Sequence, residues 1–200
     1  ATEPYQVESE KPVVLYAPTF SEKLTSAIDC FEQIKYLMEK GDQYWLIKFH
    51  PLMSEEVVEK YESISLPNVQ VVKDYSILGL LNRADVMISD TSSVVGEFML
   101  LEKPVVTYKN SLPDESMINI IHPNELASAV DMALCSSGRQ IEAIRYANSQ
   151  LHPYKDGQSS ARILDAVDEM LAGAKPQKRR PLNLFRNFKL RWRFNYWSME

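Results

Sequence analysis

A short apolar run at residues 86–88 ends at Ser89, and the polar residues Asp90, Thr91, Ser92 and Ser93 then precede a segment with the composition of a helix. Hydroxyl side chains and unpaired backbone N–H groups at a helix start can bind an anion, because they lie at the positive end of the helix dipole. The diphosphate of a nucleotide-linked donor is such an anion. Ser and Thr are also common helix N-caps. The segment alone therefore leaves a diphosphate site and an ordinary cap as alternatives.

His50 has a similar setting, because it follows the apolar run 44–49 and precedes Pro51. A histidine at a strand end can donate to a phosphate or to the charge that develops on a leaving group, which would make it catalytic. It can equally be a structural histidine. Glu97, in the helix after the serines, could reach ribose hydroxyls or remain a solvated surface charge. Asp90 could hold a neighbouring loop or orient the start of that helix.

Short apolar runs alternate with segments of helical periodicity in the first 122 residues. The predicted strands cover residues 13–17, 44–49, 69–72, 86–88 and 105–108. Runs of this kind indicate strands buried on both faces. Their alternation with helices predicts an α/β fold, a Rossmann-like doubly wound parallel sheet with helices on both faces. Ligands of such sheets bind beyond the carboxyl ends of the strands, where His50, Lys73 and Asp90 would lie.

The predicted helix between the first two strands is indicated by residues at helical spacing, with Gly41 as its stop. Those residues are Ile28, Phe31, Ile34, Leu37 and Met38. The region after residue 122 is predicted to be a helical extension, with Ser159 or Ser160 as the cap of its third helix. The predicted organisation is a polar, poorly ordered lead-in at 1–12, a nucleotide-donor-binding domain at 13–174 and a tail at 175–200.

Several classes of site find no support in the sequence. It contains no GxGxxG or GxxxxGK[ST] motif, no CxxC, HExxH or DxD motif, and no GxSxG nucleophile turn. We expect no metal and no cofactor. Cys30 and Cys135 are both expected to be small buried core residues, in keeping with a reducing compartment. No signal-peptide pattern and no apolar run near 18 residues occurs, so no membrane span is expected.

The tail differs from the body in charge. Residues 175–200 carry eight basic residues and one acidic residue, whereas residues 1–174 carry 14 basic and 26 acidic residues. On a helix, one stripe of the tail would be apolar and aromatic, comprising Leu182, Phe185, Phe188, Trp192 and Tyr196. A second stripe would be basic, comprising Arg186, Lys189 and Arg193. Residues 178–197 could therefore lie on an anionic membrane surface or pack on a protein partner. The acidic body argues against nucleic acid.

Five segments together resemble the CDP-glycerol glycerophosphotransferase family, which contains the teichoic acid primases and polymerases. The segments are YAPT (16–19), KFHP (48–51), ADVMISDTSSVVGEF (84–98), EKPVV (102–106) and YKDGQSSARI (154–163). The resemblance extends from residue 13 to about residue 170. Its HP, SDxSS and DGxSS elements are weak singly and specific in combination.

The resemblance implies a GT-B architecture of two Rossmann-like halves, of which this chain would be the C-terminal, donor-binding half. His50 would contact the donor phosphates, and Asp90 with Ser92 and Ser93 would shape the diphosphate pocket. A late helix would border that pocket through Asp156, Gly157, Ser159 and Ser160. The catalytic base would come from the N-terminal half, so this chain is expected to be inactive alone.

The implied reaction transfers glycerol phosphate, or a related polyol phosphate, from CDP-glycerol to a polymer or lipid-linked acceptor. Thr91 stands where the family often has an aromatic residue, which leaves other nucleotide donors open. One alternative is a UDP- or CMP-sugar-dependent glycosyltransferase or a nucleotide-sugar 2-epimerase. Another is a non-catalytic domain that docks a membrane or a partner. The expected location is cytoplasmic, with peripheral attachment to the inner face of the membrane as a possibility.

Overall fold

The computed structural model describes residues 3–73, 76–136, 138–173 and 182–195. The chain forms two compact units, which comprise residues 1–153 and 154–200. The predicted boundaries of a donor-binding domain at residues 13 and 174 remain a prediction.

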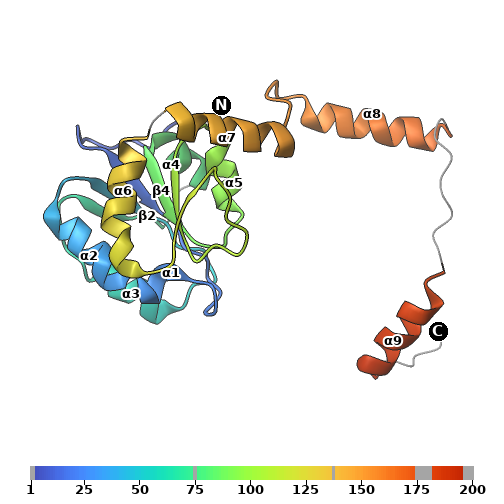
Figure 1. Cartoon of the computed structure of the whole chain (residues 1–200), viewed down its shortest axis with the longest axis horizontal. Coiled ribbons are helices and arrows are strands. Elements are labelled where there is room, and N and C mark those ends of the chain that lie inside the picture. Colours follow the sequence, from blue (N-terminus) through green and yellow to red (C-terminus); the bar gives the residue numbers. More distant parts are fainter. Residues whose placement is uncertain (1–2, 74–75, 137, 174–181, 196–200) are drawn as a thin grey trace. The chain divides into compact units, whose positions relative to one another are not determined.

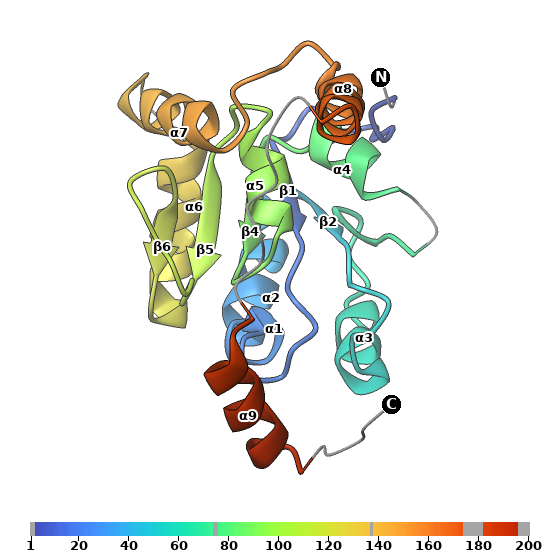
Figure 2. The same ribbon diagram turned by 90° about the vertical axis from the view of Figure 1, so that its right-hand side faces the viewer.

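The first unit is built around a parallel sheet. In the described part of the chain its strands are β1 (Val13–Tyr16), β2 (Tyr44–Ile47), β3 (Val69–Val71), β4 (Val86–Ser89), β5 (Val105–Tyr108) and β6 (Ile118–Ile120). Their order is β3-β2-β1-β4-β5-β6, and all neighbouring pairs are parallel. Figure 2 shows β6, β5, β4, β1 and β2 following one another across the sheet. The predicted doubly wound α/β fold is confirmed.

Helices cover both faces of the sheet. Alternate strand residues point to opposite faces, so Val14 and Tyr16 join one apolar cluster while Val13 and Leu15 join the other. The first cluster packs against α1 (Ser26–Asp29), α2 (Phe31–Lys40), α3 (Glu55–Glu62) and α6 (Leu126–Leu134). The second packs against α4 (Ile77–Arg83), α5 (Val94–Met99) and α7 (Gly138–Leu151). In Figure 1, α2 and α6 lie on one side of the sheet and α5 on the other.

The helix predicted after the first strand is divided into two. Cys30 ends α1 and precedes α2, with φ −95° and ψ 1°. Ile28, before the break, is 58% exposed, whereas the residues at helical spacing after the break are buried, namely Phe31, Ile34, Leu37 and Met38. The predicted stop is confirmed, because Gly41 ends α2 in the left-handed conformation that glycine adopts without steric cost.

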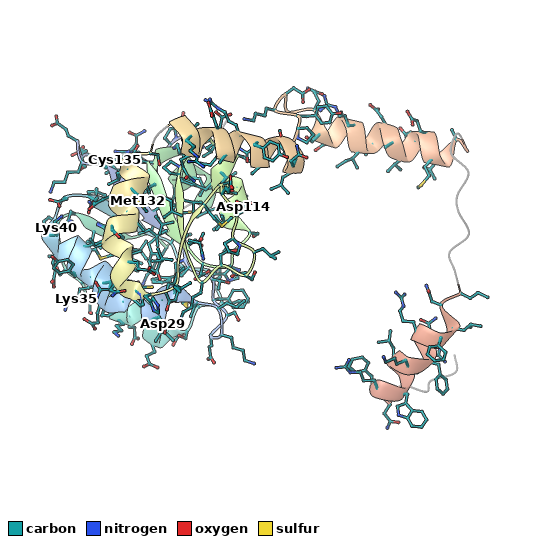
Figure 3. The ribbon with its side chains drawn as sticks, in the orientation of Figure 1. Asp29, Lys35, Lys40, Asp114, Met132 and Cys135 are labelled. Carbon is teal, nitrogen blue, oxygen red and sulfur yellow. The ribbon has the colours of Figure 1, made fainter. Side chains whose placement is uncertain are left out.

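Two further expectations fail in the first unit. Tyr5 and Val7 pack against the second apolar cluster, and the Tyr5 N–H donates to the Gly79 carbonyl at 3.0 Å. These contacts order the segment that the sequence predicts to be a loose lead-in. Cys30 is buried as expected, and burial raises its pKa to about 12. Cys135 is exposed at the end of α6, so its prediction as a core residue is wrong (Figure 3).

The second unit contains α8 (Ser159–Leu171) and α9 (Leu184–Arg193) in its described part, and neither helix has a buried residue. Gln158 occupies the N-cap of α8 without a side-chain bond, so the predicted cap at Ser159 or Ser160 is wrong and these serines are the first two helical residues. No helix among the described residues is both long and apolar enough to cross a membrane.

The tail helix agrees in part with its prediction. Phe185, Phe188 and Trp192 lie in α9 with exposed side chains, and the rings of Phe188 and Trp192 are 6.1 Å apart. The predicted basic stripe also falls within α9. Leu182 precedes the helix, and Tyr196 lies outside the described residues.

Candidate functional site

The strand order reverses between β1 and β4, which pair with each other although the chain forms β2 and β3 between them. In an open parallel sheet, the crevice beyond the carboxyl ends of the strands at such a reversal is the usual ligand site. The loop after β1 contains Thr19 and Phe20, and the turn after β4 contains residues 90–93. His50 follows β2, which pairs with β1 on its other side. The predicted segments thus reach the same edge of the sheet.

Asp90 joins the loop after β1 to the turn after β4. Its carboxylate accepts hydrogen bonds from the backbone N–H groups of Thr19, at 3.0 Å, and Ser26, at 2.8 Å. It also accepts a hydrogen bond from the Ser26 hydroxyl at 2.9 Å. That hydroxyl lies 3.0 Å from the Tyr16 hydroxyl, which must therefore be the donor in their contact. This geometry matches the alternative in which Asp90 holds a neighbouring loop.

The Asp90 side chain is completely buried. Burial raises its pKa above the ordinary aspartate value, although the hydrogen bonds from Ser26 and Thr19 act in the opposite direction. Removing the donors from a buried carboxylate would cost several kilocalories per mole of folding free energy, at about 1–3 kcal/mol for each group. The fold therefore strongly specifies the position of this side chain.

A second set of hydrogen bonds fixes the loop after β5 to the same turn. The Asn110 side-chain amide donates to the Asp90 carbonyl at 2.8 Å, and the Ser111 N–H donates to Thr91 Oγ1 at 3.0 Å. The Asn110 N–H in turn donates to Asn119 Oδ1 at 3.0 Å. Three loops from β1, β4 and β5 are therefore tied together around Asp90 and Thr91.

Ser92 and Ser93 do not act as conventional caps. Ser93 occupies the N-cap of α5 without a side-chain hydrogen bond to the helix. Ser93 is exposed and Ser92 half-buried. Within the described residues, the N–H groups of Ser92, Ser93 and Val94 have no protein acceptor. The cap alternative is thus not realised by Ser93, and this turn retains donors that an anion could use.

His50 is exposed and makes two defined contacts. Its ring stacks on that of Phe20, with the centroids 4.4 Å apart and the planes at 28°. Its Nδ1 accepts a hydrogen bond from the Leu52 N–H at 3.1 Å. A neutral imidazole whose Nδ1 accepts carries its proton on Nε2, so Nε2 is a donor. The predicted phosphate contact would use this atom.

Several grooves lie on the described part of the first unit. One of about 500 Å³ opens beside His50 and is lined in part by Lys48, Glu59 and Lys73. Another, of about 980 Å³, runs along α7 and is lined in part by Asp114 and Tyr146. The second groove contains none of the predicted site residues.

The remaining predicted residues lie apart from this turn or in the other unit. Glu97 is exposed on α5. Asp156 accepts hydrogen bonds from the Gln158 N–H at 3.0 Å and from Arg162, and this pairing lowers its pKa. Gly157 adopts φ 73° before the start of α8. The hydrogen bonds described for Asp156 are local, and the place of this motif at a diphosphate pocket remains a prediction.

Four residues that shape the site were not predicted from the sequence. Thr19 and Ser26 hold the Asp90 carboxylate, Asn110 ties the loop after β5, and Phe20 stacks on His50. YAPT includes Thr19, but nothing local signals its partner 71 residues away. In the described ranges no three His, Cys, Asp or Glu side chains cluster as metal ligands do.

A family model for CDP-Glycerol:Poly(glycerophosphate) glycerophosphotransferase matches residues 1–115. A curated relative, the teichoic acid glycerol-phosphate primase of Bacillus spizizenii, is 29% identical over 179 residues, which are 82% of this chain and 45% of the relative. The chain spans about half the length of the curated primases that it matches.

Solved structures share the fold. The wall teichoic acid polymerase TagF, in a histidine-to-asparagine variant soaked with CDPG, matches with a TM-score of 0.59 and 21% identity over 82% of this chain and 42% of that one. A structure assigned to a UDP-N-acetylglucosamine 2-epimerase of Listeria monocytogenes matches with a TM-score of 0.64 and 16% identity, over 90% of this chain and 52% of that one. At these identities the likeness concerns the fold, which is one half of each of these longer chains.

The family model covers more than half of this sequence and includes the loop after β1, His50 and the whole of the turn after β4. Four of the five motifs lie within the matched residues, and the reversal of strand order and the tied loops are consistent with the match. The chain belongs to the CDP-glycerol:poly(glycerophosphate) glycerophosphotransferase family.

Proposed function

We propose that this chain is the donor-binding half of a transferase that moves glycerol phosphate, or a related polyol phosphate, from a CDP-linked donor to a cell-wall or capsular polymer. An acceptor hydroxyl would attack the β-phosphorus of the donor. The bond from that phosphorus to the bridging oxygen would break, and CMP would leave with the bridging oxygen. The base that takes the acceptor proton is expected from the other half of such enzymes.

The observation that carries this proposal is the set of donors at the reversal of strand order. Ser92, Ser93 and Val94 offer N–H groups, and the two serines also offer hydroxyls, on a turn that Asp90 and Thr91 fix to two neighbouring loops. Preorganised donors of this kind stabilise the charge that develops on a departing phosphate. The first 174 residues carry a net negative charge, so local donors rather than the overall field must attract the diphosphate.

His50 is proposed as the catalytic residue on this half. Its Nε2–H would donate to the diphosphate and offset the negative charge that grows on CMP as it leaves. The Asp156–Ser160 segment is proposed to border the same pocket in the complete enzyme. Neither a metal nor a cofactor is part of this scheme.

Calorimetric titration of the chain with CDP-glycerol, CMP, UDP and UDP-N-acetylglucosamine tests the donor. We expect cytidine-selective binding. Uridine-selective binding would favour the second candidate, a sugar transferase or 2-epimerase, to which the likeness with the Listeria structure lends support. If none of the four binds to a folded chain, that result would favour the alternative of a non-catalytic domain that docks a membrane or a partner.

The tail is proposed to attach the enzyme to the cytoplasmic face of a membrane. Among the described residues α9 carries four basic and no acidic side chains, together with exposed aromatic rings. Such a helix lies in the interface of an anionic bilayer, where its apolar face inserts and its cations meet the lipid headgroups. A polymer acceptor that carries a lipid anchor would be held at the same surface.

Vesicle sedimentation tests this attachment. The chain should bind vesicles that contain phosphatidylglycerol and lose that binding when Lys189 and Arg193 are changed to Glu. Substitution of Lys35 and Lys40 on α2 with Glu is the matched control. Equal binding by both double variants would contradict the tail proposal.

A further inference from the structure

Phe20 is an exposed aromatic residue with one defined partner. Its side chain is 40% exposed, and its ring lies 4.4 Å from the ring of His50 at an angle of 28°. A single exposed apolar residue needs no special explanation. A face-to-face contact with the histidine of the candidate site is a more specific feature.

The contact restricts the imidazole in a way that the Leu52 hydrogen bond alone does not. The Leu52 N–H holds the Nδ1 edge of His50, while Phe20 covers one face of the ring. The hydrogen bond keeps the Nδ1 edge of the imidazole toward Leu52, and the stacking keeps the plane of the imidazole close to that of the Phe20 ring. Together they leave Nε2, which carries the proton, as the free polar atom of the side chain.

The residue before Phe20 is held in place by the buried carboxylate. This residue, Thr19, donates its backbone N–H to both oxygens of Asp90, at 3.0 and 3.2 Å. The same Asp90 begins the turn that contains Ser92 and Ser93. The serine turn is therefore linked to His50 in three steps. Asp90 binds the Thr19 N–H, Thr19 is the chain neighbour of Phe20, and the Phe20 ring stacks on His50.

We infer that Phe20 is a positioning residue for His50, which fixes the direction of Nε2–H relative to the serine turn. Phe20 does not touch the reacting atoms in this scheme. The assignment of a diphosphate as the ligand rests on the proposed function, whereas the orientation of the free imidazole does not. Aromatic stacking is of a size that shifts an orientation equilibrium by about two- to tenfold.

Histidine-selective nitrogen NMR of the 200-residue chain tests the inference directly, because the sequence contains only His50, His122 and His152. In the wild-type chain we expect the carbon-bound ring protons of His50 to be shifted upfield by the Phe20 ring, and its neutral ring to be the Nε2–H tautomer. The absence of that upfield shift in the folded wild type would overturn the inference whatever the variants do.

Phe20→Leu should abolish the upfield shift and release the imidazole from the Leu52 N–H, so that His50 becomes a mixture of tautomers while the signals of the other two histidines stay in place. Phe20→Tyr keeps the stacked ring and should restore the wild-type signals. Leu24→Ala is the matched control, because Leu24 is an apolar residue of the same loop with a similar exposure. A single Nε2–H tautomer that persists in a folded Phe20→Leu chain would show that Phe20 does not position the ring.

Titration with CDP-glycerol separates this inference from the proposed function. Phe20→Leu should weaken binding by about two- to tenfold, and Phe20→Tyr should recover it. If the wild type binds and Phe20→Leu binds equally well, the positioning role is wrong. If the wild type does not bind and its His50 signals are as predicted, the proposed function fails and the positioning of the imidazole stands.

Discussion

The chain contains two segments in which an aspartate precedes a pair of serines, Asp90–Ser93 and Asp156–Ser160, and the structure treats them in opposite ways. Asp90 is completely buried and bound by donors 64 and 71 residues away. Asp156 is exposed and bound by groups two and six residues away. The two motifs look alike in sequence, but one is fixed by the tertiary fold and the other by its own local turn.

This difference shows what each motif can contribute by itself. The segment at Asp90 is hydrogen-bonded to the loops after β1 and β5, so its serines have a defined place at the edge of the sheet. The segment at Asp156 needs a further surface to give its serines a place, and in the described residues α8 buries none of its side chains. The first motif is therefore fixed by the fold, whereas the role that we propose for the second requires it to dock at another surface.

The largest difference between the motifs should appear in stability. Asp90→Ala leaves the N–H groups of Thr19 and Ser26 and the Ser26 hydroxyl without their acceptor, and each buried unsatisfied donor costs about 1–3 kcal/mol. We expect the free energy of unfolding to fall by about 3–5 kcal/mol in urea denaturation. Asp156→Ala, at the exposed motif, should lower it far less, because solvent screens the exposed pair with Arg162.

Asp90→Asn offers a variant that keeps the shape of the side chain if the alanine variant does not fold. It should still be destabilised, because its amide NH₂ faces a donor where the carboxylate oxygen accepted one. Equal stabilities for the Asp90 and Asp156 variants would contradict the contrast between a tertiary and a local motif.

The second effect concerns ligand affinity. Ser93→Ala should weaken CDP-glycerol binding by about 10- to 100-fold, which is the size of one hydrogen bond to a charged group. It should do so without changing the urea midpoint, because Ser93 makes no cap bond. Calorimetry on the chain alone measures both this variant and its counterpart Ser160→Ala.

Ser160→Ala sharpens the comparison. An undiminished affinity would mean that the Asp156–Ser160 segment does not reach the ligand in this chain. A loss as large as that of Ser93→Ala would show that the segment docks at the pocket without further domains.

The smallest effect is in pH dependence, where the two aspartates should have opposite signs. Burial raises the pKa of Asp90, so its contribution to stability is present at low pH and declines as pH rises through that raised pKa. Arg162 lowers the pKa of Asp156, so its contribution is present above pH 3.8 and is lost as pH falls through the lowered pKa. Carboxyl carbon NMR should find Asp90 titrating above 3.8 and Asp156 below it.

Much of the fold could be predicted because the buried strands of a parallel sheet are nearly continuous apolar runs. β1, β4 and β5 are buried at every position, and each was evident in the sequence. β6 was missed because it is a short edge strand with Asn119 at its centre, which binds Thr107 and Asn110. The break at Cys30 has no local signal, since no Gly or Pro marks it.

Only those parts of the candidate site that lie next to a predicted strand in the sequence could be predicted. The apolar run followed by Asp90 and the serines, and the His50–Pro51 step, place those residues at strand ends. Their partners come from other loops, so the Asp90–Thr19 and His50–Phe20 contacts could be found only from the tertiary structure. Sequence likewise could not tell a buried carboxylate from the exposed one at Asp156.

The central claim is that a nucleotide diphosphate binds at the serine turn beside His50. Amide and histidine NMR of the chain during a CDP-glycerol titration tests it most directly. We predict that the amides of residues 92–94 and the His50 ring shift together and saturate with one affinity. Shifts confined to the α7 groove around Asp114 and Tyr146, with the serine turn unchanged, would contradict the account.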